Sequence, residues 1–213
     1  MIENNIEYYD ISPELSESIA VWPGDVEFKH LVTIDFKTGG NILLSSINTS
    51  THLGAHTDAP NHYNPNGEGI DKRDLTFYLG DCQVITIKKA RSSRILLEDL
   101  TGVKVEAKRI LFKTLSYPNP SSWSSDFVSL SPELIHSIAK RGVILVGIDT
   151  PSIDPCDDRS LLSHQAVYEN NMAILEGIVL NNVPDGCYSL ISLPLKIKNA
   201  DASPVRAILI KKC

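Results

Sequence analysis

Residues 142–148 constrain the fold most, because all seven are glycine or aliphatic residues. A strand that is apolar on both faces has to be covered on both faces, so this run predicts a central strand inside a layered fold. Seven further stretches are rich in β-branched and aromatic residues, as strands are; they are residues 6–11, 28–35, 43–49, 83–88, 109–114, 188–195 and 205–211. The chain is therefore predicted to be built mainly around β-structure.

Helices are expected to be few. The clearest is predicted over residues 132–141, since Ser131 can cap its start and Gly142 can end it. Two others are predicted, a second one over residues 164–170 and a short one over residues 93–100. Because strands and helices do not alternate regularly, we expect an α/β fold with a mixed sheet or barrel and few peripheral helices, not a doubly wound sheet.

Residues 116–126 cannot form a regular element, because proline, asparagine and serine dominate them. The segment carries one large aromatic residue, Trp123. Two interpretations stay open: a solvated loop that Trp123 anchors by packing, or a flap that covers a bound substrate.

Charge and composition exclude several classes of protein. The formal net charge is −6 and no basic block is present, so nucleic acid is not expected as a partner. No apolar run reaches the roughly 18 residues that cross a membrane, and the first residues do not resemble a signal peptide. The four cysteines show no paired spacing, which favours reduced thiols in the cytoplasm.

Three of the six histidines fall within residues 52–62: His52, His56 and His62, with Asp58 between them. Imidazole and carboxylate groups are the ligands that divalent transition metals prefer. The four-residue spacing predicts His52 and His56 on one face of a helical turn, which the chain must leave for Asp58 to reach the same point. The two oxygens of Asp58 would allow it to bridge two ions. His62 does not repeat the spacing and is expected to stay free of the metal.

His164 and Glu176 are weaker candidates when the residues alone are considered, because the fold would have to bring them together. His30 and His136 are interpreted as ordinary surface histidines. The sequence has neither the Gly-x-Ser-x-Gly motif of α/β-hydrolases nor a glycine-rich phosphate-binding loop.

The stretch from His52 to His62, His-Leu-Gly-Ala-His-Thr-Asp-Ala-Pro-Asn-His, resembles the signature of the metal-dependent cyclase/hydrolase family. The similarity runs nearly end to end. It includes residues 10–13, 147–152, 163–164, 174–176 and 193–195. The segments Val-Trp-Pro-Gly-Asp at 21–25 and Ala-Asp-Ala-Ser-Pro-Val-Arg-Ala at 200–207 are similar to the bacterial kynurenine formamidase (arylformamidase) branch of that family.

This resemblance implies a swivelling β/β/α fold, a homodimer, and hydrolysis of the small molecule N-formyl-L-kynurenine to L-kynurenine and formate in tryptophan catabolism. It also implies roles for particular residues. His52, His56 and Asp58 would hold one ion, and Asp58, His164 and Glu176 a second, usually zinc; His62 would be catalytic and Trp22 would contact the substrate. Manganese, cobalt or iron would suit the same ligands. Since the ligands span the chain and must converge, residues 1–213 are expected to form one domain.

Hydrolysis of a formamide is slow because its carbonyl is a poor electrophile and water at neutral pH is a poor nucleophile. A metal lowers the pKa of water toward about 7 and polarises a carbonyl, so we expect hydroxide generated there to attack the formyl carbon while His62 carries a proton to the leaving arylamine. Trp22 precedes Pro23 and Gly24, a pair suited to a type II turn that would hold the indole against an aromatic substrate. Alternatively, Trp22 packs under that turn.

Two other functions stay open at this point. The same site would also suit another small amide or ester, or a cyclic amide such as isatin. The chain would otherwise be a non-catalytic binding protein that a metal stabilises.

Overall fold

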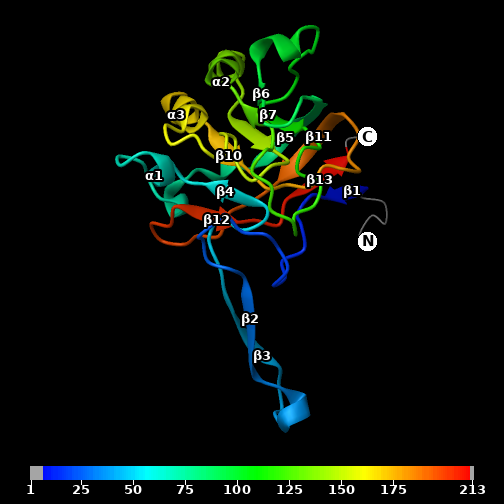
Figure 1. Cartoon of the computed structure of the whole chain (residues 1–213), viewed down its shortest axis with the longest axis vertical. Coiled ribbons are helices and arrows are strands. Elements are labelled where there is room, and N and C mark those ends of the chain that lie inside the picture. The colour runs from blue at the N-terminus through cyan, green and yellow to red at the C-terminus, as the bar shows by residue number, and fades with distance from the viewer. Residues whose placement is uncertain (1–6, 212–213) are drawn as a thin grey trace.

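A curled, seven-stranded mixed sheet forms the centre of the fold (Figure 1). In a computed structural model that describes residues 7–211, the strands run in the order β1, β13, β11, β5, β7, β9 and β10. Their bounds are β1 Tyr8–Asp10, β13 Ile208–Lys211, β11 Gly186–Ile191, β5 Leu79–Thr86, β7 Arg109–Lys113, β9 Leu145–Ile148 and β10 Ala173–Leu175. The half from β5 to β10 is parallel, and the other half is antiparallel. The predicted α/β class with a mixed sheet is confirmed.

Three smaller pairs of strands are separate from this sheet: β4 (His56–Asp58) with β12 (Ala202–Pro204), β6 (Arg94–Ile95) with β8 (Ser129–Leu130), and β2 (Lys29–Ile34) with β3 (Leu44–Asn48). The α-helices of the described residues are α1 (Pro60–Tyr63), α2 (Pro132–Ala139) and α3 (Leu162–Glu169). Short 3-10 turns cover Phe36–Thr38, Ile70–Lys72, Leu75–Phe77 and Leu97–Leu100. Within residues 7–211, no helix is both long and apolar enough to cross a membrane.

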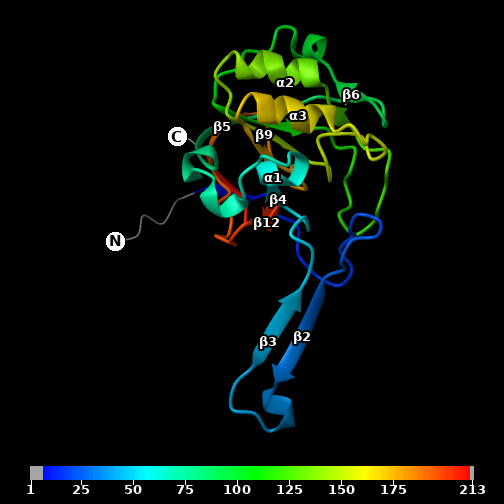
Figure 2. The same cartoon turned by 90° about the vertical axis from the view of Figure 1, so that its left-hand side faces the viewer.

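Strand β9 is covered on both faces, as its apolar sequence predicts. Val146 and Ile148 belong to a core that α2 and α3 complete, and those two helices lie together over one face of the sheet (Figure 2). Leu145 belongs to a second core on the opposite face. The strand begins three residues later than predicted. Helix α2 ends at Ala139, and Gly142, with a positive φ of 87°, turns the chain before it extends.

Other expectations are confirmed or corrected locally. Helix α2 begins where predicted, and the Ser131 hydroxyl accepts a hydrogen bond from the Leu134 N–H at 3.2 Å. The helix predicted over 93–100 is wrong in its first half, where Arg94 and Ile95 pair with Ser129 and Leu130 as strands. In the stretch predicted over 6–11, Ile6 lies outside the described residues.

The hairpin of β2 and β3 projects away from the rest of the molecule (Figures 1 and 2). Every residue of both strands is exposed. Both strands were predicted from local sequence, but the projection itself has no local signal.

Because a hydrophobic core lies on each face of the sheet, shortening a side chain in either core should lower the stability of the protein. Phe112 on β7 is fully buried in the core beneath α2 and α3. Phe112→Ala is expected to lower the free energy of unfolding by about 3–5 kcal/mol, since it removes a large side chain and leaves a cavity. Leu75→Ala, at an exposed leucine, should change it by less than about 0.5 kcal/mol. Urea denaturation of both variants measures this, and equal losses would contradict the proposed position of the core.

Candidate metal centre

An antiparallel bridge joins the two clusters of candidate ligands. The His56 N–H donates to the Glu176 carbonyl at 3.1 Å, and the Glu176 N–H donates to the His56 carbonyl at 2.9 Å. His56 begins β4, and Glu176 directly follows β10. The next residue, Gly177, has a φ of 64° and passes so close to Gly54 that a side chain there would overlap the Gly54 carbonyl. The fold thus brings together the two clusters that are distant in sequence.

The predicted helical turn at the histidine cluster is wrong. His56 and Asp58 lie on strand β4, where residues two apart point to the same face. His52 lies in the preceding turn, and Gly54 within that turn has a φ of 59°, a left-handed conformation that interrupts a right-handed helix. Strand periodicity, not helical periodicity, therefore aligns the side chains.

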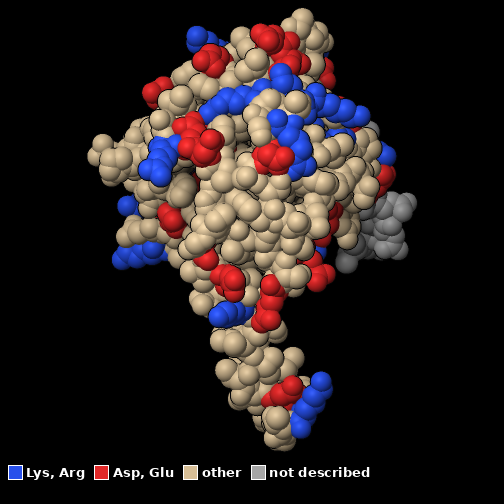
Figure 3. All heavy atoms as spheres, in the orientation of Figure 1, with Lys and Arg blue, Asp and Glu red and all other residues tan. Residues whose placement is uncertain are grey.

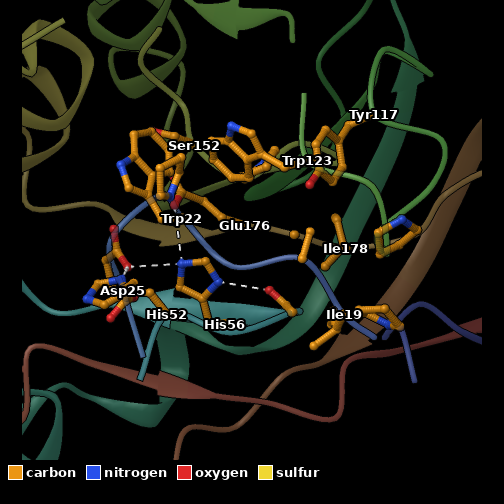
Figure 4. Close-up of a pocket in the computed structure, with 18 of the residues that line it drawn as sticks. Ile19, Trp22, Asp25, His52, His56, Tyr117, Trp123, Ser152, Glu176 and Ile178 are labelled. Atoms are coloured by element: carbon orange, nitrogen blue, oxygen red, sulfur yellow. Dashed lines mark hydrogen bonds and ion pairs between the residues drawn. The ribbon is translucent and has the colours of Figure 1, made fainter. Parts of the chain in front are cut away.

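Three imidazoles and two carboxylates face one another at the centre of the site. Asp58 Oδ1 lies 3.0 Å from His52 Nδ1 and 3.5 Å from His56 Nε2, while Oδ2 lies 3.4 Å from His164 Nε2. Glu176 completes the cluster, with one oxygen 3.4 Å from His56 Nε2 and the other 3.6 Å from His164 Nε2. Figure 4 shows His56 and Glu176 in this arrangement. The structure thus assembles all five residues that were predicted as ligands.

The arrangement fits a divalent cation. Both Asp58 oxygens are buried and accept no hydrogen bond within the described structure, and a buried carboxylate is costly unless positive charge compensates it. Two ligand atoms that share one zinc ion at 2.0–2.1 Å in tetrahedral geometry lie about 3.3 Å apart, which is close to the observed spacings. His52, His56 and Asp58 form one group of candidate ligands, and Asp58, His164 and Glu176 form another. Each Asp58 oxygen faces one group, as a bridging carboxylate would.

Each of the three imidazoles is oriented by a hydrogen bond on its other nitrogen. His56 Nδ1 lies 2.9 Å from the Gly54 carbonyl, His164 Nδ1 lies 2.8 Å from Asp154, and His52 Nε2 lies 3.2 Å from Asp201. Acceptors of this kind fix the tautomer and the ring angle of metal-ligating histidines. These contacts leave the inward nitrogen of each ring free to bind a cation.

Asp154 and Asp201 were not predicted as site residues. Asp154 also accepts the N–H groups of Ser163 and His164 at 3.0 Å, which holds the start of helix α3 against the site. Asp201 accepts the Thr51 hydroxyl at 2.9 Å. Asp201 belongs to the 200–207 segment that carried the family resemblance, whereas nothing in the local sequence distinguishes Asp154.

The carboxylates set the protonation of the histidines. Burial by itself lowers the pKa of His52, but Asp58 and Asp201 raise it to about 9. Burial likewise opposes the effect of Asp154 and Asp58 on His164, whose pKa is raised to about 10. Burial alone would raise the pKa of Asp58, yet the facing imidazoles hold it well below its usual range. Protons on imidazoles therefore balance the buried carboxylates until a cation replaces them.

His62 lies on helix α1, at the side of the cluster. Its ring centre is 4.1 Å from that of His52, and its Nδ1 is 3.8 Å from an Asp201 oxygen. Burial is the main cause of the lowered pKa of His62. His52, His62 and Asp201 are themselves close enough to hold a cation, a third grouping that the sequence did not predict.

The cluster opens into a pocket of about 450 Å³ with an aromatic wall. The rings of Trp22 and Trp123 meet edge to face with their centres 5.0 Å apart, and Phe127 packs 6.3 Å from Trp22. Figure 4 shows both indoles and Tyr117 across the pocket from His52 and His56. This wall would accommodate a planar aromatic group beside the cluster.

Two loops build that wall. Trp22 begins the predicted type II turn, in which the Asp25 N–H donates to the Trp22 carbonyl at 2.9 Å and Gly24 has a φ of 90°. The irregular segment 116–126 contributes Tyr117 and Trp123. It therefore forms a wall of the pocket, and its Trp123 packs against Trp22 at the same time.

Comparison with known proteins identifies relatives of the sequence and of the fold. Residues 9–155 match the Cyclase family model, described as "Putative cyclase". The chain is 36% identical over 204 residues to the kynurenine formamidase of Bacillus cytotoxicus, covering 95% of this chain and 97% of that one. A structure described as a potential metal-dependent hydrolase with cyclase activity has a TM-score of 0.84 at 23% identity, covering 98% of this chain and all of the other. An isatin hydrolase has a TM-score of 0.83 at 17% identity, covering 98% and 93%, which shows the shared fold.

Metal binding to the metal-free protein is expected to release about two protons near neutral pH. His52 and His164, with pKa values of about 9 and about 10, are protonated there, whereas a ligating nitrogen must be unprotonated. Because both values lie above the ordinary 6.5, the apparent affinity should rise with pH up to about 9–10. Calorimetric titration with zinc in buffers of different ionisation enthalpy counts the protons. Absence of proton release would contradict the prediction, and His136→Ala should leave the count unchanged.

Proposed function

The chain belongs to the cyclase family, and from this premise we propose that it is an amidohydrolase that cleaves N-formyl-L-kynurenine to L-kynurenine and formate. The observation that carries the proposal is a buried cluster of three imidazoles and two carboxylates that opens into a pocket walled by indoles. The 36% sequence identity to a kynurenine formamidase, over 95% of the chain, supports this substrate. Its place would then be tryptophan catabolism, in the cytoplasm, a location that the cysteine spacing of the sequence favours.

The proposed metal ligands are those of the two adjoining groups. His52, His56 and Asp58 would hold one ion, and Asp58, His164 and Glu176 a second, with zinc the proposed metal. A divalent metal there supplies polarisation of the formyl carbonyl and a lowered pKa for water. Asp154, Asp201 and the Gly54 carbonyl keep the three rings in position through the hydrogen bonds described above. Either group could hold one ion by itself. Both groups could hold an ion at the same time, because Asp58 is the one ligand that they share and it has two oxygens.

His62 is proposed to move the proton. Its imidazole lines the pocket and lies within ion-pair distance of Asp201, which would steady the ring. As water attacks the formyl carbon, His62 accepts a proton from it and delivers that proton to the aromatic amine nitrogen when the C–N bond breaks. A C–O bond replaces the C–N bond, and His62 returns to its starting protonation state.

The aromatic wall is proposed to hold the aryl ring of the substrate. Trp22 stands on a rigid turn and Trp123 packs against it, so little side-chain freedom would be lost on binding. Asp25, whose carboxylate also accepts the Val26 N–H at 2.7 Å, lines the same pocket. A carboxylate there suits the α-ammonium group of formylkynurenine.

Isatin remains the second candidate substrate, since an isatin hydrolase shares the fold. Isatin carries no ammonium group, so the Asp25 carboxylate favours formylkynurenine over it. The alternative of a non-catalytic binding protein is set aside, because the chain belongs to the cyclase family and a relative at 36% identity is a kynurenine formamidase. Release of formate from N-formyl-L-kynurenine by the zinc-loaded protein, compared with opening of isatin, tests the choice of substrate.

We also propose that the chain is one domain and that it acts as a homodimer. The single domain is supported by β1, near the start of the chain, pairing with β13 near its end. The convergence of candidate ligands from His52 to Glu176 on one site supports it as well.

His62→Ala is expected to lower kcat about 10²–10⁴-fold, the usual contribution of general acid–base catalysis, while the metal content stays unchanged. His56→Ala should lose both metal and turnover, because its ring faces both carboxylates. Metal analysis and the absorbance change on hydrolysis of N-formyl-L-kynurenine measure the two properties. His136→Ala is the matched control, since His136 does not line the pocket. An unchanged kcat in His62→Ala would remove the assigned role.

Trp22→Ala is expected to raise KM for N-formyl-L-kynurenine about tenfold, because an aromatic contact and its buried area are lost. The effect on N-methylformamide, which has no ring, should be much smaller. Trp22→Phe keeps an aromatic face and should recover most of the affinity. Equal effects of Trp22→Ala on both substrates would show that Trp22 only supports the turn.

A further inference from the structure

A third cluster of imidazole and carboxylate groups lies beside the two groups of proposed metal ligands, which we call the inner groups. It consists of His52, His62 and Asp201, which each offer a ligand atom within 4.8 Å of the others; we call these residues the outer group. The side chains of His62 and Asp201 are 34% and 49% exposed, whereas those of Asp58 and Glu176 are at most 3% exposed. The outer group is therefore open to ions from the solvent.

One oxygen of Asp201 faces both imidazoles of the outer group. Asp201 Oδ2 lies 3.2 Å from His52 Nε2 and 3.8 Å from His62 Nδ1. The second distance is too long for a hydrogen bond, so no shared proton joins those two atoms directly. Ligand atoms that share a tetrahedral zinc ion lie about 3.3 Å apart, which is close to both spacings. Small movements of the side chains would thus bring all three donors to one ion.

The fold holds Asp201 in the orientation that such an ion needs. The Thr51 hydroxyl donates to Asp201 Oδ1 at 2.9 Å, which leaves Oδ2 directed at the imidazoles. The Ala59 N–H donates to the Asp201 carbonyl at 2.8 Å, and the next residue, Ala202, pairs with Asp58 across β12 and β4. The strand pair that carries two of the proposed inner ligands therefore also fixes the position of the outer carboxylate.

The charge around the outer group favours a cation. Within residues 7–211, the ion pairs of Asp201 are all with imidazoles, and no lysine or arginine lines the pocket. Asp25 lines that pocket and adds a second carboxylate. Figure 3 shows more acidic than basic atoms around the base of the projecting hairpin, which follows the pocket-lining turn 22–25 in the chain. A negative potential of this kind raises the local concentration of cations.

Two imidazole nitrogens and one carboxylate oxygen select the kind of cation. Zinc and similar transition metals bind such a set, whereas magnesium and calcium prefer oxygen ligands alone. The outer group is partly exposed, and one of its members, His52, is shared with an inner group. It should therefore bind zinc more weakly than the inner groups do, so that an ion enters it only after they are filled.

We propose that the outer group binds a further zinc ion when free zinc is abundant, and that this ion inhibits the hydrolase. The inhibition rests on the proposed function, because it depends on His62 moving the proton. A neutral imidazole has one unprotonated nitrogen. If Nδ1 of His62 binds the ion, Nε2 carries the hydrogen and no nitrogen is left to accept a proton from water. Turnover is then lost while the inner ions stay bound.

Metal uptake tests the outer site by itself. The full chain with its inner groups loaded is dialysed against buffers that hold free zinc between about 1 and about 100 µM, a range that brackets a dissociation constant of about 10 µM. The wild type is expected to take up one further ion per chain. His62→Ala and Asp201→Asn should each weaken binding of that ion more than about tenfold, because a ligand is lost.

His136→Ala is the matched control for metal uptake. His136 Nε2 lies 3.7 Å from a Glu169 oxygen, so these two residues form another partly exposed imidazole–carboxylate pair, and neither lines the pocket. Uptake by this variant should equal that of the wild type. Circular dichroism verifies that each variant is folded.

The rate of formate release from N-formyl-L-kynurenine tests the inhibition. With a dissociation constant of about 10 µM, raising free zinc from about 1 to about 100 µM should lower the wild-type rate about tenfold by mass action. Magnesium at the same concentrations should leave the rate unchanged, because the outer group is poor in oxygen ligands. The slower turnover expected of Asp201→Asn should change by less than about twofold over the zinc range.

The two measurements separate the site from its effect. A wild type that takes up no further zinc, or uptake that persists in both folded outer-group variants, would overturn the outer site. Uptake that both variants abolish, without any effect of zinc on the wild-type rate, would overturn the inhibition. A wild type that binds the inner ions but releases no formate at any zinc concentration would count against the proposed substrate, and the dialysis would still decide the outer site.

Discussion

The buried carboxylate of Asp58 is the constraint around which the site is organised. Within residues 7–211 neither of its oxygens accepts a hydrogen bond, and three imidazole nitrogens approach it at ion-pair distances of 3.0–3.5 Å. Burial of such a charge costs several kcal/mol unless positive charge compensates it. Protons on His52 and His164 provide this charge in the metal-free chain, and a divalent cation provides it more completely. The site therefore favours cation binding through the same interaction that would destabilise the fold without compensation.

The parallel half of the sheet supplies the rigid frame for this cluster. Glu176 follows the carboxyl end of β10, and Asp149 follows that of β9. Asp149 is buried there and accepts the Thr114 and Leu115 N–H groups at 2.9 and 2.8 Å. These hydrogen bonds attach the start of the irregular segment 116–126 to the sheet. Carboxyl ends of parallel strands meet at one edge of a sheet, where ligand sites commonly form. One edge thus positions both a candidate metal ligand and the loop that walls the pocket.

Expectations drawn from local patterns were accurate where local physics decides the outcome. The cap and proline at the start of helix 132–139 and the Pro-Gly turn after Trp22 need no distant contacts, and both are present. The helical turn assigned to His52 and His56 was wrong, because a spacing of four residues also suits a turn that enters a strand. Residues 93–100 illustrate the same limit, since pairing with Ser129 and Leu130 overrides the helical pattern there.

By itself, the sequence determined the donor chemistry: three clustered histidines with one aspartate, an apolar central strand, and a mixed α/β class. Local spacing could not bring Glu176 to His56 or Asp154 to His164, because these pairs meet only through a strand bridge and a helix start that the whole sheet positions. The tertiary structure alone also decided that the apolar hairpin leaves the body. The hydrophobic pattern of a strand indicates that its side chains favour burial. It does not indicate which part of the structure packs over the strand, because that depends on contacts between residues that are distant in the sequence.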